Sequence, residues 1–347
     1  MKCLEIVTLD EIEKWNTLVK TFKSYDVYYL NDYVKAFNIH GDGEPFLFYF
    51  ENETTRAINV VLKRDIANAE PLKDKLNKNT YFDLTTPYGY GGFLIEGNDF
   101  KTLNEEYTSY CRNENIICEF VRYHPLLENW LGFELMYDQV HLGETVYLET
   151  TSEDLIWKNI SSKNRNVIRK AQKSGLRTYW CRAPQIIQPF MEIYKTTMDK
   201  DEADLYYYFE KPFYESVLED LKQNAMWFYT ELDGVIASIA IILFCNGKVH
   251  YHLSAARKAY MRYAPTNLLL YDVAKWACEN GYKKLHLGGG VNSEHDSLYK
   301  FKKAFNRGED SEFWIGKKIF NQVLYEELVG LRGQLDECSQ FFPKYRQ

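Results

Sequence analysis

Apolar and polar positions follow two periods along this chain, and these periods predict one order of strands and helices in the first 150 residues. Short runs of alternating or continuous apolar residues indicate strands, and apolar residues three and four apart indicate a helix. The elements expected here are a β-hairpin at 45–50 and 57–63, a strand at 81–85, a helix at 101–111 and a strand at 116–121. They make one α/β unit.

The same order of elements returns in the second half. Asp233-Gly234 is a tight-turn pair between two apolar runs, which favours a second hairpin. The expected elements are a hairpin at 227–231 and 235–245, a strand at 248–254, a helix at 266–280 and a strand at 283–287. Because repeated element order indicates duplication, we expect two related domains facing each other across a cleft, at 1–150 and 151–314.

Apolar residues also recur at helical spacing from 319 to 335. This stripe predicts that the C-terminal segment, 315–347, forms a helix that packs back on the first domain.

The strand at 283–287 runs into three consecutive glycines, Gly288, Gly289 and Gly290, which permit close backbone approaches. Leu298, Phe301 and Phe305 then recur at helical spacing, with lysines between them. Strand, glycine turn and basic helix together suit an anionic or oxyanion-forming substrate. The alternative is a tight connection followed by a solvated amphipathic helix.

A second basic segment lies between the two halves. From 156 to 182 every charged residue is positive, and Ser161 and Gly175 bracket a short helix that contains Lys163 and Arg165. Such a stretch in an acidic protein indicates a phosphate or polyanion contact, with a solvated helix as the alternative.

Two loops display tyrosines. Tyr88 and Tyr90 lie in the glycine-rich loop PYGYGG, and Tyr206 and Tyr207 lie in an aromatic run at 206–209. A tyrosine packs through its ring and offers a hydroxyl group, so these side chains are candidates for lining a ligand cleft or for half-buried packing.

Composition describes a globular protein with enough apolar material for two domains: 347 residues, 46% hydrophobic and 16% aromatic. The net charge of −7 argues against non-specific DNA binding. Seven cysteines without a C-x-x-C pair predict reduced thiols. With no secretory signal at the N-terminus and no apolar run long enough to span a membrane, we expect a cytoplasmic location.

Several chemistries find no support. The histidines lack zinc-site spacing, and His250 with His252, two apart on one strand, is more typical of packing, so no metal is expected. The chain has neither a nucleophile elbow nor a phosphate-binding P-loop.

Four segments in order, PYGYGG at 87–92, RYHP at 122–125, KNRNVIRKAQKSG at 163–175 and HLGGG followed by DSLYKFKKAF, resemble the FemABX family of peptidoglycan interpeptide-bridge aminoacyltransferases. The resemblance covers nearly the whole chain and implies two tandem GNAT-like domains, an α/β fold with mixed sheets. The long helical hairpin of some larger members is absent, a departure that places tRNA handling by such an arm in doubt.

The resemblance implies an acyltransferase that moves an amino acid from aminoacyl-tRNA to an amine of a peptidoglycan precursor, in cell wall biogenesis. The implied partners are charged tRNA and a UDP- or lipid-linked muropeptide, with room for a transient membrane-surface association. No cofactor is implied.

One departure bears on the donor. Acetyl-CoA-dependent GNAT enzymes bind the pyrophosphate in a loop with glycines, whose backbone N–H groups approach the phosphates. The counterpart here has Tyr260 and Arg262 at those positions. Transfer from an acyl-CoA donor therefore stays as the alternative, and a non-catalytic precursor-binding protein is the second alternative.

The resemblance places a cationic catalytic lysine at Lys302, directly after Phe301. A lysine there can stabilise the oxyanion of aminoacyl transfer. Tyr251, on the strand at 248–254, is a weaker candidate for orienting the acceptor or relaying a proton. The candidate substrate-binding residues are Arg165, Lys163, Tyr88, Tyr90, Tyr206, Tyr207 and Gly289.

Overall fold

The computed structural model describes residues 3–333 and 340–347, and these form two compact units. Unit 1 comprises the chain up to Leu142 together with the segment from Phe313 on, and unit 2 comprises Gly143–Glu312. The boundaries at 150 and 314 stay predictions, as does the cleft between the domains. Each unit is an α/β structure with a mixed sheet, so the predicted fold class is confirmed.

Unit 1 is built on a twisted sheet with the order β1-β2-β3-β4-β6-β13, in which β5 pairs with β3. All its described pairs are antiparallel except β4 with β6. Its strands are β1 (Leu4–Thr8), β2 (Glu44–Glu51), β3 (Arg56–Asp65), β4 (Phe82–Thr85), β5 (Leu94–Glu96), β6 (Ile116–Arg122) and β13 (Ser311–Ile319). The predicted hairpin at 45–63 is β2 and β3.

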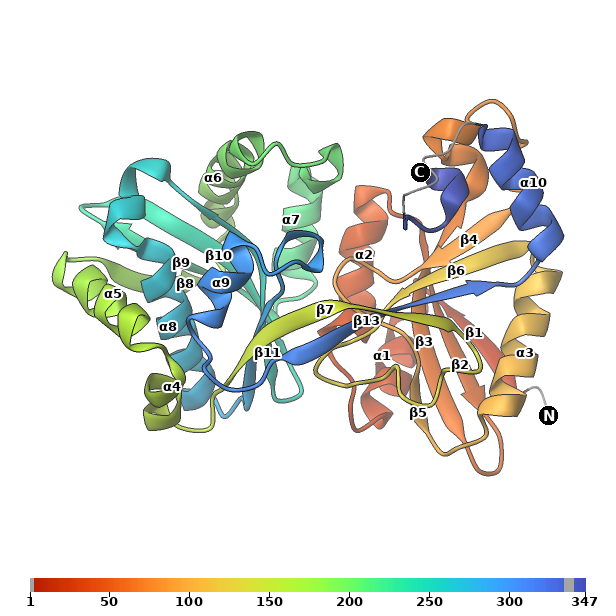
Figure 1. The fold of residues 1–347 in the computed structure, drawn as a ribbon, viewed down its shortest axis with the longest axis horizontal. Helices are drawn as coiled ribbons and strands as arrows, with labels where there is room; N and C mark the ends of the chain where they lie inside the picture. Colours follow the sequence, from red (N-terminus) through yellow and green to blue (C-terminus); the bar gives the residue numbers. More distant parts are fainter. Residues whose placement is uncertain (1–2, 334–339) are drawn as a thin grey trace. The chain divides into compact units, whose positions relative to one another are not determined.

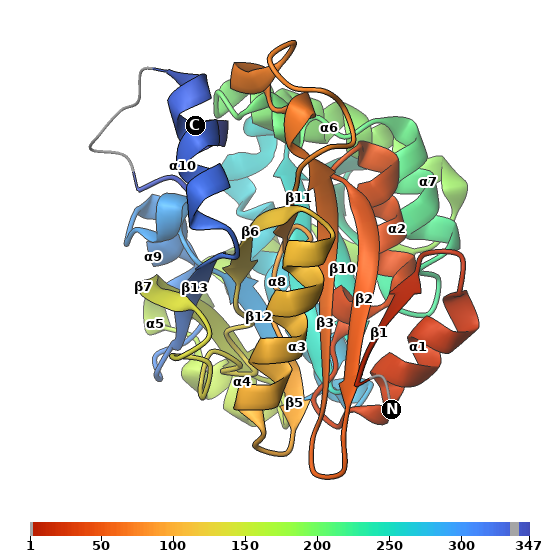
Figure 2. The same ribbon diagram turned by 90° about the vertical axis from the view of Figure 1, so that its right-hand side faces the viewer.

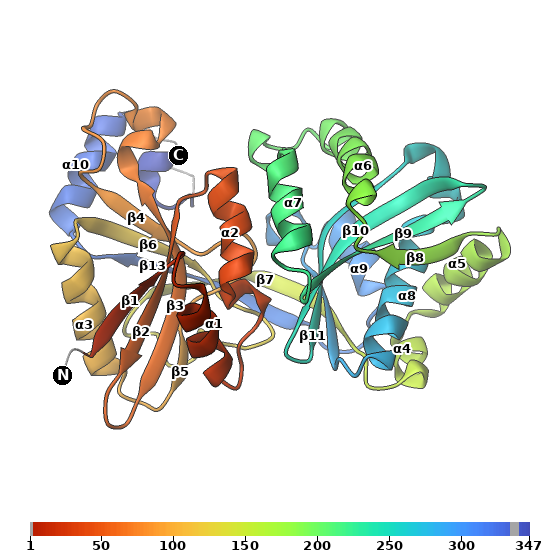
Figure 3. The same cartoon turned by 180° about the vertical axis from the view of Figure 1, so that it is seen from behind.

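Helices cover both faces of this sheet, with α3 and α10 on one face and α1 and α2 on the other (Figures 1 and 3). Figure 2 looks onto the face that α3 crosses. The helices are α1 (Ile12–Thr21), α2 (Asn31–His40), α3 (Phe100–Asn113) and α10 (Gln322–Arg332). The core beneath α3 is rich in aromatic residues, among them Phe48, Tyr107 and Phe320.

The C-terminal segment differs from its prediction. The helix expected from 315 begins only at Gln322, and 315–319 belongs to β13, which pairs with β6. Phe313 and Ile315 are buried on alternate positions, and Gly316 lets the Tyr123 ring approach the strand backbone, which a side chain would prevent. Leu335 of the expected stripe lies outside the described residues. Helix α10 packs through Tyr325 and Leu328 against Leu72 and Cys118.

Unit 2 has a sheet with the order β7-β12-β11-β10-β9-β8. The pair β11 with β12 is parallel, and the other described pairs are antiparallel. Its strands are β7 (Asp138–Glu149), β8 (Arg177–Cys181), β9 (Ala225–Leu232), β10 (Val235–Cys245), β11 (Lys248–Ala256) and β12 (Lys284–Gly288).

The helices of unit 2 lie on both faces of its sheet. Figures 1 and 3 place α4, α5 and α8 on one face and α6 and α7 on the other. They are α4 (Glu153–Asn159), α5 (Ser162–Lys173), α6 (Ile187–Lys200), α7 (Lys211–Glu219), α8 (Pro265–Glu279) and α9 (Ser297–Lys303). Helix α5 is the predicted basic helix, capped by the Ser161 hydroxyl, which accepts from the Asn164 N–H.

Candidate active site around Lys302

The three glycines form a sharp connection between β12 and α9 in unit 2. Gly288 has a φ of +78°, a conformation that favours glycine. A Cβ on Gly289 would lie 2.9 Å from the backbone oxygen of Glu144, and one on Gly290 would collide with Glu294 and Asp296. The glycines are therefore required because the backbone packs directly against neighbouring backbone and carboxylate groups.

The turn ends at Asp296, which fixes the start of α9. Its carboxylate accepts from the backbone N–H groups of Tyr299, at 2.8 Å, and Val291, at 3.3 Å. The first of these bonds contributes most to lowering the pKa of Asp296. One charged side chain thus holds both the glycine connection and the helix that carries Lys302.

Lys302 points back at the glycines. Its Nζ donates a hydrogen bond of 2.6 Å to the carbonyl oxygen of Gly289, and only 9% of the residue is exposed. Burial lowers the pKa of Lys302 to about 8, and the nearby Asp296 carboxylate opposes this shift in part. The ammonium form therefore predominates at neutral pH. An ammonium has three donors, so N–H groups remain beyond the one that binds Gly289.

A polar cluster that the sequence did not indicate lies around Tyr299 of α9, one helical turn before Lys302. The Tyr299 hydroxyl lies 2.6 Å from Asp310 Oδ2 and 3.0 Å from Glu144 Oε2. Lys303 forms an ion pair of 2.7 Å with Asp310, and His295 stacks on the Tyr299 ring. Burial, followed by the Asp310 carboxylate, raises the pKa of Tyr299. This cluster anchors α9 to β7 and to the segment that precedes β13.

Tyr251 lies on β11, with its ring partly buried against the core of unit 2. Burial raises the pKa of its hydroxyl to about 12, so the phenol stays protonated at neutral pH. In the described part of the chain no hydrogen bond joins Tyr251 to Lys302. Its catalytic role stays a prediction.

Arg165 and Lys163 lie on the first turn of α5. Arg165 is half-buried and donates through Nη1 to the backbone oxygen of Trp157 at 3.1 Å, whereas Lys163 is exposed. The start of α5 is tied to the end of α9, because the Ser161 N–H and the Asn164 amide both donate to Ala304 O, at 2.9 and 3.3 Å. The basic helix therefore begins beside the helix of Lys302.

Tyr206 and Tyr207 belong to a short 3₁₀ turn in unit 2, Leu205–Tyr207. Both are half-buried, and their rings meet edge to face at 5.4 Å. Tyr206 also packs edge to face with Phe209. The substrate contact predicted for these rings stays a prediction.

Tyr88 and Tyr90 belong to unit 1. The Tyr88 backbone oxygen accepts a hydrogen bond from the Tyr33 hydroxyl, and the Tyr90 ring packs edge to face on Tyr28. Burial raises the pKa of Tyr90 to about 12. Both tyrosines are thus held by their own unit, and their role in substrate binding stays a prediction.

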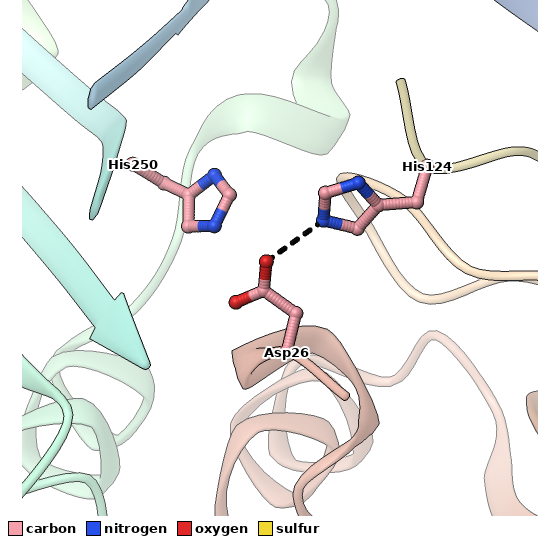
Figure 4. A group of neighbouring side chains, drawn as sticks. All are labelled: Asp26, His124 and His250. Carbon is pink, nitrogen blue, oxygen red and sulfur yellow. Dashed lines mark hydrogen bonds and ion pairs between the residues drawn. The ribbon is translucent and has the colours of Figure 1, made fainter. Parts of the chain in front are cut away.

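The RYHP segment places a buried histidine in unit 1. His124 Nε2 lies 2.9 Å from Asp26 Oδ2, and both side chains are fully buried (Figure 4). The backbone N–H of His124 donates to the Asn129 side chain, which fixes the segment. No local sequence pattern indicates that His124 is paired, because its partner Asp26 lies 98 positions away.

No helix among the described residues is long and apolar enough to cross a membrane.

A model of a known protein family matches part of unit 2. The family described as "Acetyltransferase (GNAT) domain" matches residues 159–303, which contain the basic helix, β11, the glycines and Lys302. In sequence, the chain is 27% identical over 112 residues to the "Lipid II:glycine glycyltransferase" of Staphylococcus haemolyticus, and 27% over 115 residues to that of Staphylococcus epidermidis. The matches cover 31% and 32% of this chain but only 27% and 28% of these relatives, so the chain matches about a quarter of their length.

The fold as a whole has matches among solved structures. The chain superposes on FemX with a TM-score of 0.68 and 16% identity, over 93% of this chain and 99% of that one. The C-terminal domain of a putative lysylphosphatidylglycerol synthetase from Agrobacterium fabrum gives a TM-score of 0.58 at 12% identity, over 89% and 92% of the two chains.

At these identities the superpositions establish the fold, which is that of FemX across both units. The sequence comparisons add a match to the GNAT domain within unit 2 and a partial similarity to glycyltransferases. Residues 159–303 thus match the GNAT acetyltransferase-domain family, and the chain as a whole has the fold of FemX.

Proposed function

We propose that this protein is an aminoacyltransferase that moves an amino acid from charged tRNA to an amine of a peptidoglycan precursor. The lipid II:glycine glycyltransferases among its relatives support this class of acceptor. The single observation that carries the proposal is the buried ammonium of Lys302 against the Gly289 carbonyl, within the GNAT-matching region.

The reaction makes a peptide bond and breaks an ester. The acceptor amine attacks the ester carbonyl of the aminoacyl group, and the oxygen of the tetrahedral species carries negative charge. When the C–O bond breaks, the ribose oxygen leaves and takes up a proton, and the new amide nitrogen has lost one. A fixed ammonium beside the negatively charged oxygen of the tetrahedral species lowers the barrier, because the ammonium binds the transition state more strongly than it binds the ester. Lys302 is the proposed ammonium.

The acceptor carries phosphates and a peptide. Within unit 2, Arg165 and Lys163 on the first turn of α5 are the proposed phosphate contacts, because guanidinium and ammonium groups suit phosphate oxygens. Tyr206 and Tyr207 are the proposed contacts to the peptide or sugar. Arg165 keeps donors for this role beyond the one bound to Trp157.

An acyl-CoA donor is the second candidate, and the description of the matching family favours it. The local structure argues against the usual phosphate cradle. Residues 257–264 contain no glycine, Tyr260 packs against the core, and α8 begins with Pro265, which has no N–H to offer a phosphate.

The test offers the protein either charged tRNA or acetyl-CoA, together with a UDP-linked or lipid-linked muropeptide, and measures the mass added. We expect an aminoacyl increment with charged tRNA. An acetyl increment would establish the second candidate, and an unmodified but bound muropeptide would indicate a non-catalytic binding protein.

The role of Lys302 is tested by Lys302→Met, with Lys300→Met on the same short helix as a matched control, because Lys300 is exposed. Loss of one positioned oxyanion partner typically costs about 10²–10³ in turnover. We expect a loss of that size for Lys302→Met and near-normal transfer for Lys300→Met. Equal activity of the two variants would remove Lys302 from the mechanism.

A further inference from the structure

A groove in unit 2 takes no part in the reaction described above. It has a volume of about 440 Å³ and lies between the end of α5, strand β8 and helix α8 (Figure 3). Part of its lining is apolar and buried, and the rest carries charges of both signs. The residues concerned are Leu176, Leu268 and Trp276 in the apolar part, and Arg177, Asp272 and Lys275 in the charged part.

The groove is separate from the candidate active site. The start of α5 is bonded to the end of α9, because the Ser161 N–H and the Asn164 amide both donate to Ala304 O. Gln172, which lines the groove, lies on the same helix about two turns after Asn164, or about 12 Å further along its axis. A small ligand in the groove is therefore a second ligand and not the group on which Lys302 would act.

Trp180 is an exposed aromatic wall of the groove. It lies on β8, the last strand of the unit 2 sheet, and is 50% exposed. Its ring stacks on Phe228, with centroids 5.6 Å apart and planes at 28°, and Phe228 in turn packs edge to face on Trp276. This stack fixes the indole and leaves half of it accessible. The face of an indole attracts ammonium groups more strongly than the other aromatic side chains do.

Asp272 is a half-buried carboxylate without a paired cation. Its Oδ2 accepts from the Thr178 hydroxyl at 2.6 Å, and within the described part of the chain it forms no ion pair. Burial raises the pKa of Asp272, and the Thr178 hydroxyl and the nearby Lys275 oppose this rise only in part. A carboxylate has about four acceptor sites, so sites remain beyond the one that binds Thr178. Because charges removed from water are normally paired, an ammonium on a ligand would supply the missing partner.

Positive groups lie in the same groove. Arg177 is exposed and donates through Nη1 to the Leu176 backbone oxygen at 3.0 Å, which leaves other guanidinium donors for a ligand. Lys275 is 3.9 Å from Glu153, a long surface ion pair that holds its ammonium only weakly. Glu279 adds a second negative charge to the lining, which disfavours a purely anionic ligand. The ligand that matches this lining carries both charges.

We propose that the groove binds a small zwitterion, with its ammonium between Asp272 and the Trp180 face and its anionic group at Arg177 and Lys275. A free α-amino acid with an apolar side chain has this chemistry, since the buried Leu176 and Leu268 offer that side chain an apolar surface. The headgroup of an ethanolamine phospholipid, with its ammonium and phosphate, is the other source of the same chemistry. This inference goes beyond the proposed function and does not depend on it.

The binding test is a ligand-observed NMR titration of the full chain with three forms of one amino acid. They are L-leucine, L-leucinamide, which lacks the carboxylate, and N-acetyl-L-leucine, which lacks the ammonium. We expect L-leucine to bind most tightly and N-acetyl-L-leucine most weakly. Equal affinity for the three forms would overturn the inference, because the groove would then recognise neither charge.

O-phosphoethanolamine is the fourth probe and distinguishes the two sources. Weaker binding of this probe than of L-leucine would support a site for a free amino acid. Tighter binding would support the same zwitterion site with a phospholipid headgroup as its ligand.

Two variants place the binding in this groove. Asp272→Asn keeps an acceptor for Thr178 but removes the charge, so it should weaken L-leucine binding about tenfold to a hundredfold. Trp180→Ala should weaken it about twofold to thirtyfold, as expected for the loss of one cation–π contact. The matched control is Glu219→Gln, which makes the same change of charge at an exposed residue of α7 and should bind L-leucine normally.

L-leucine affinity that neither Asp272→Asn nor Trp180→Ala changes would overturn the inference, even if L-leucine bound elsewhere on the protein. The two proposals also fail separately, because the titration involves no transfer. A protein that transfers an aminoacyl group but binds no zwitterion in the groove would keep the proposed function and lose this site. A protein that binds the zwitterion but transfers nothing would keep the site and lose the function.

Discussion

Burial of the Lys302 ammonium costs free energy, and its surroundings offset that cost only in part. The Gly289 carbonyl accepts one hydrogen bond and the Asp296 carboxylate is near, yet the pKa of Lys302 is still lowered to about 8. A lysine that served only to keep its helix soluble would lie in water, as Lys300 does. The buried position of Lys302 therefore supports its proposed catalytic role, because a desolvated cation acts more strongly on a developing charge.

The lowered pKa predicts a pH dependence of transfer. The Lys302 ammonium is present below pH 8 and is lost as the pH rises through about 8, so the rate should fall on the alkaline side of that value. An unburied lysine would keep its charge to about pH 10.4. The measurement is the turnover rate from pH 6 to pH 10 with saturating substrates.

Lys302→Arg separates this explanation from a general effect of alkali. A guanidinium keeps its proton throughout the range, so the variant should lack the alkaline fall even if its overall rate is lower. An alkaline fall of the same shape in Lys302→Arg would assign the titration to another group.

At the scale of elements, the Asp296 carboxylate couples the glycine connection to α9. Asp296→Ala removes the cap from a seven-residue helix, and the loss of such a cap typically costs about 0.5–2 kcal/mol. We expect lower stability against denaturant together with lower transfer, because the same bonds hold Lys302 toward Gly289.

Asp296→Asn is the informative comparison. Asparagine caps helices about as well as aspartate, so α9 should persist. The lost negative charge removes a contribution that raises the pKa of Lys302, so the alkaline fall in rate should move to lower pH. An unchanged pH profile in Asp296→Asn would show that this carboxylate acts on Lys302 only through the helix.

Sequence patterns located the elements whose signal is local. The hairpin of β9 and β10 follows from a tight turn between two apolar runs, and α5 follows from its serine cap and Gly175. Strand β13 was missed because its buried positions, Phe313 and Ile315, become informative only when β6 lies beside them. A short strand adjoining a helical stripe cannot be separated from it by periodicity alone.

The contacts of the candidate site likewise divide into those that the sequence could indicate and those that only the fold reveals. The pairing of Lys302 with the glycine connection could be anticipated, since thirteen positions separate Lys302 from Gly289 on one strand-turn-helix segment. The Tyr299 cluster could not, because Glu144 lies 155 positions earlier and reaches the hydroxyl only through the fold. No pattern within α9 distinguishes a tyrosine that anchors the helix from one that merely packs.

At the scale of the whole molecule, each unit has its own core, and unit 1 takes part of its core from the far end of the chain. Asp83 is fully buried on β4 and binds two cations, Arg64 at 2.7 Å and Arg346 at 2.6 Å, and the Tyr345 hydroxyl donates to it at 2.8 Å. Burial alone would raise the pKa of Asp83, but the two guanidinium groups outweigh it and the pKa is lowered. The segment carrying Arg346 is thus tied to the sheet by charge as well as by packing.

Arg346→Ala should therefore destabilise unit 1. Removing one partner from a buried ion pair typically costs about 3–5 kcal/mol, and the remaining Arg64 should hold the loss near or below about 3 kcal/mol. The neighbouring Lys344 is exposed, so Lys344→Ala is a control in the same segment that should leave stability within about 0.5 kcal/mol.

The effect of Arg346→Ala should also depend on pH. Because the pKa of Asp83 is lower in the folded than in the unfolded protein, the contribution of Asp83 to stability is present above about pH 4 and is lost as the pH falls further. Chemical denaturation at several pH values should accordingly show a gap between the unmodified protein and Arg346→Ala that narrows in acid. A gap that stays constant with pH would mean that Arg346 stabilises unit 1 through packing and not through the Asp83 charge.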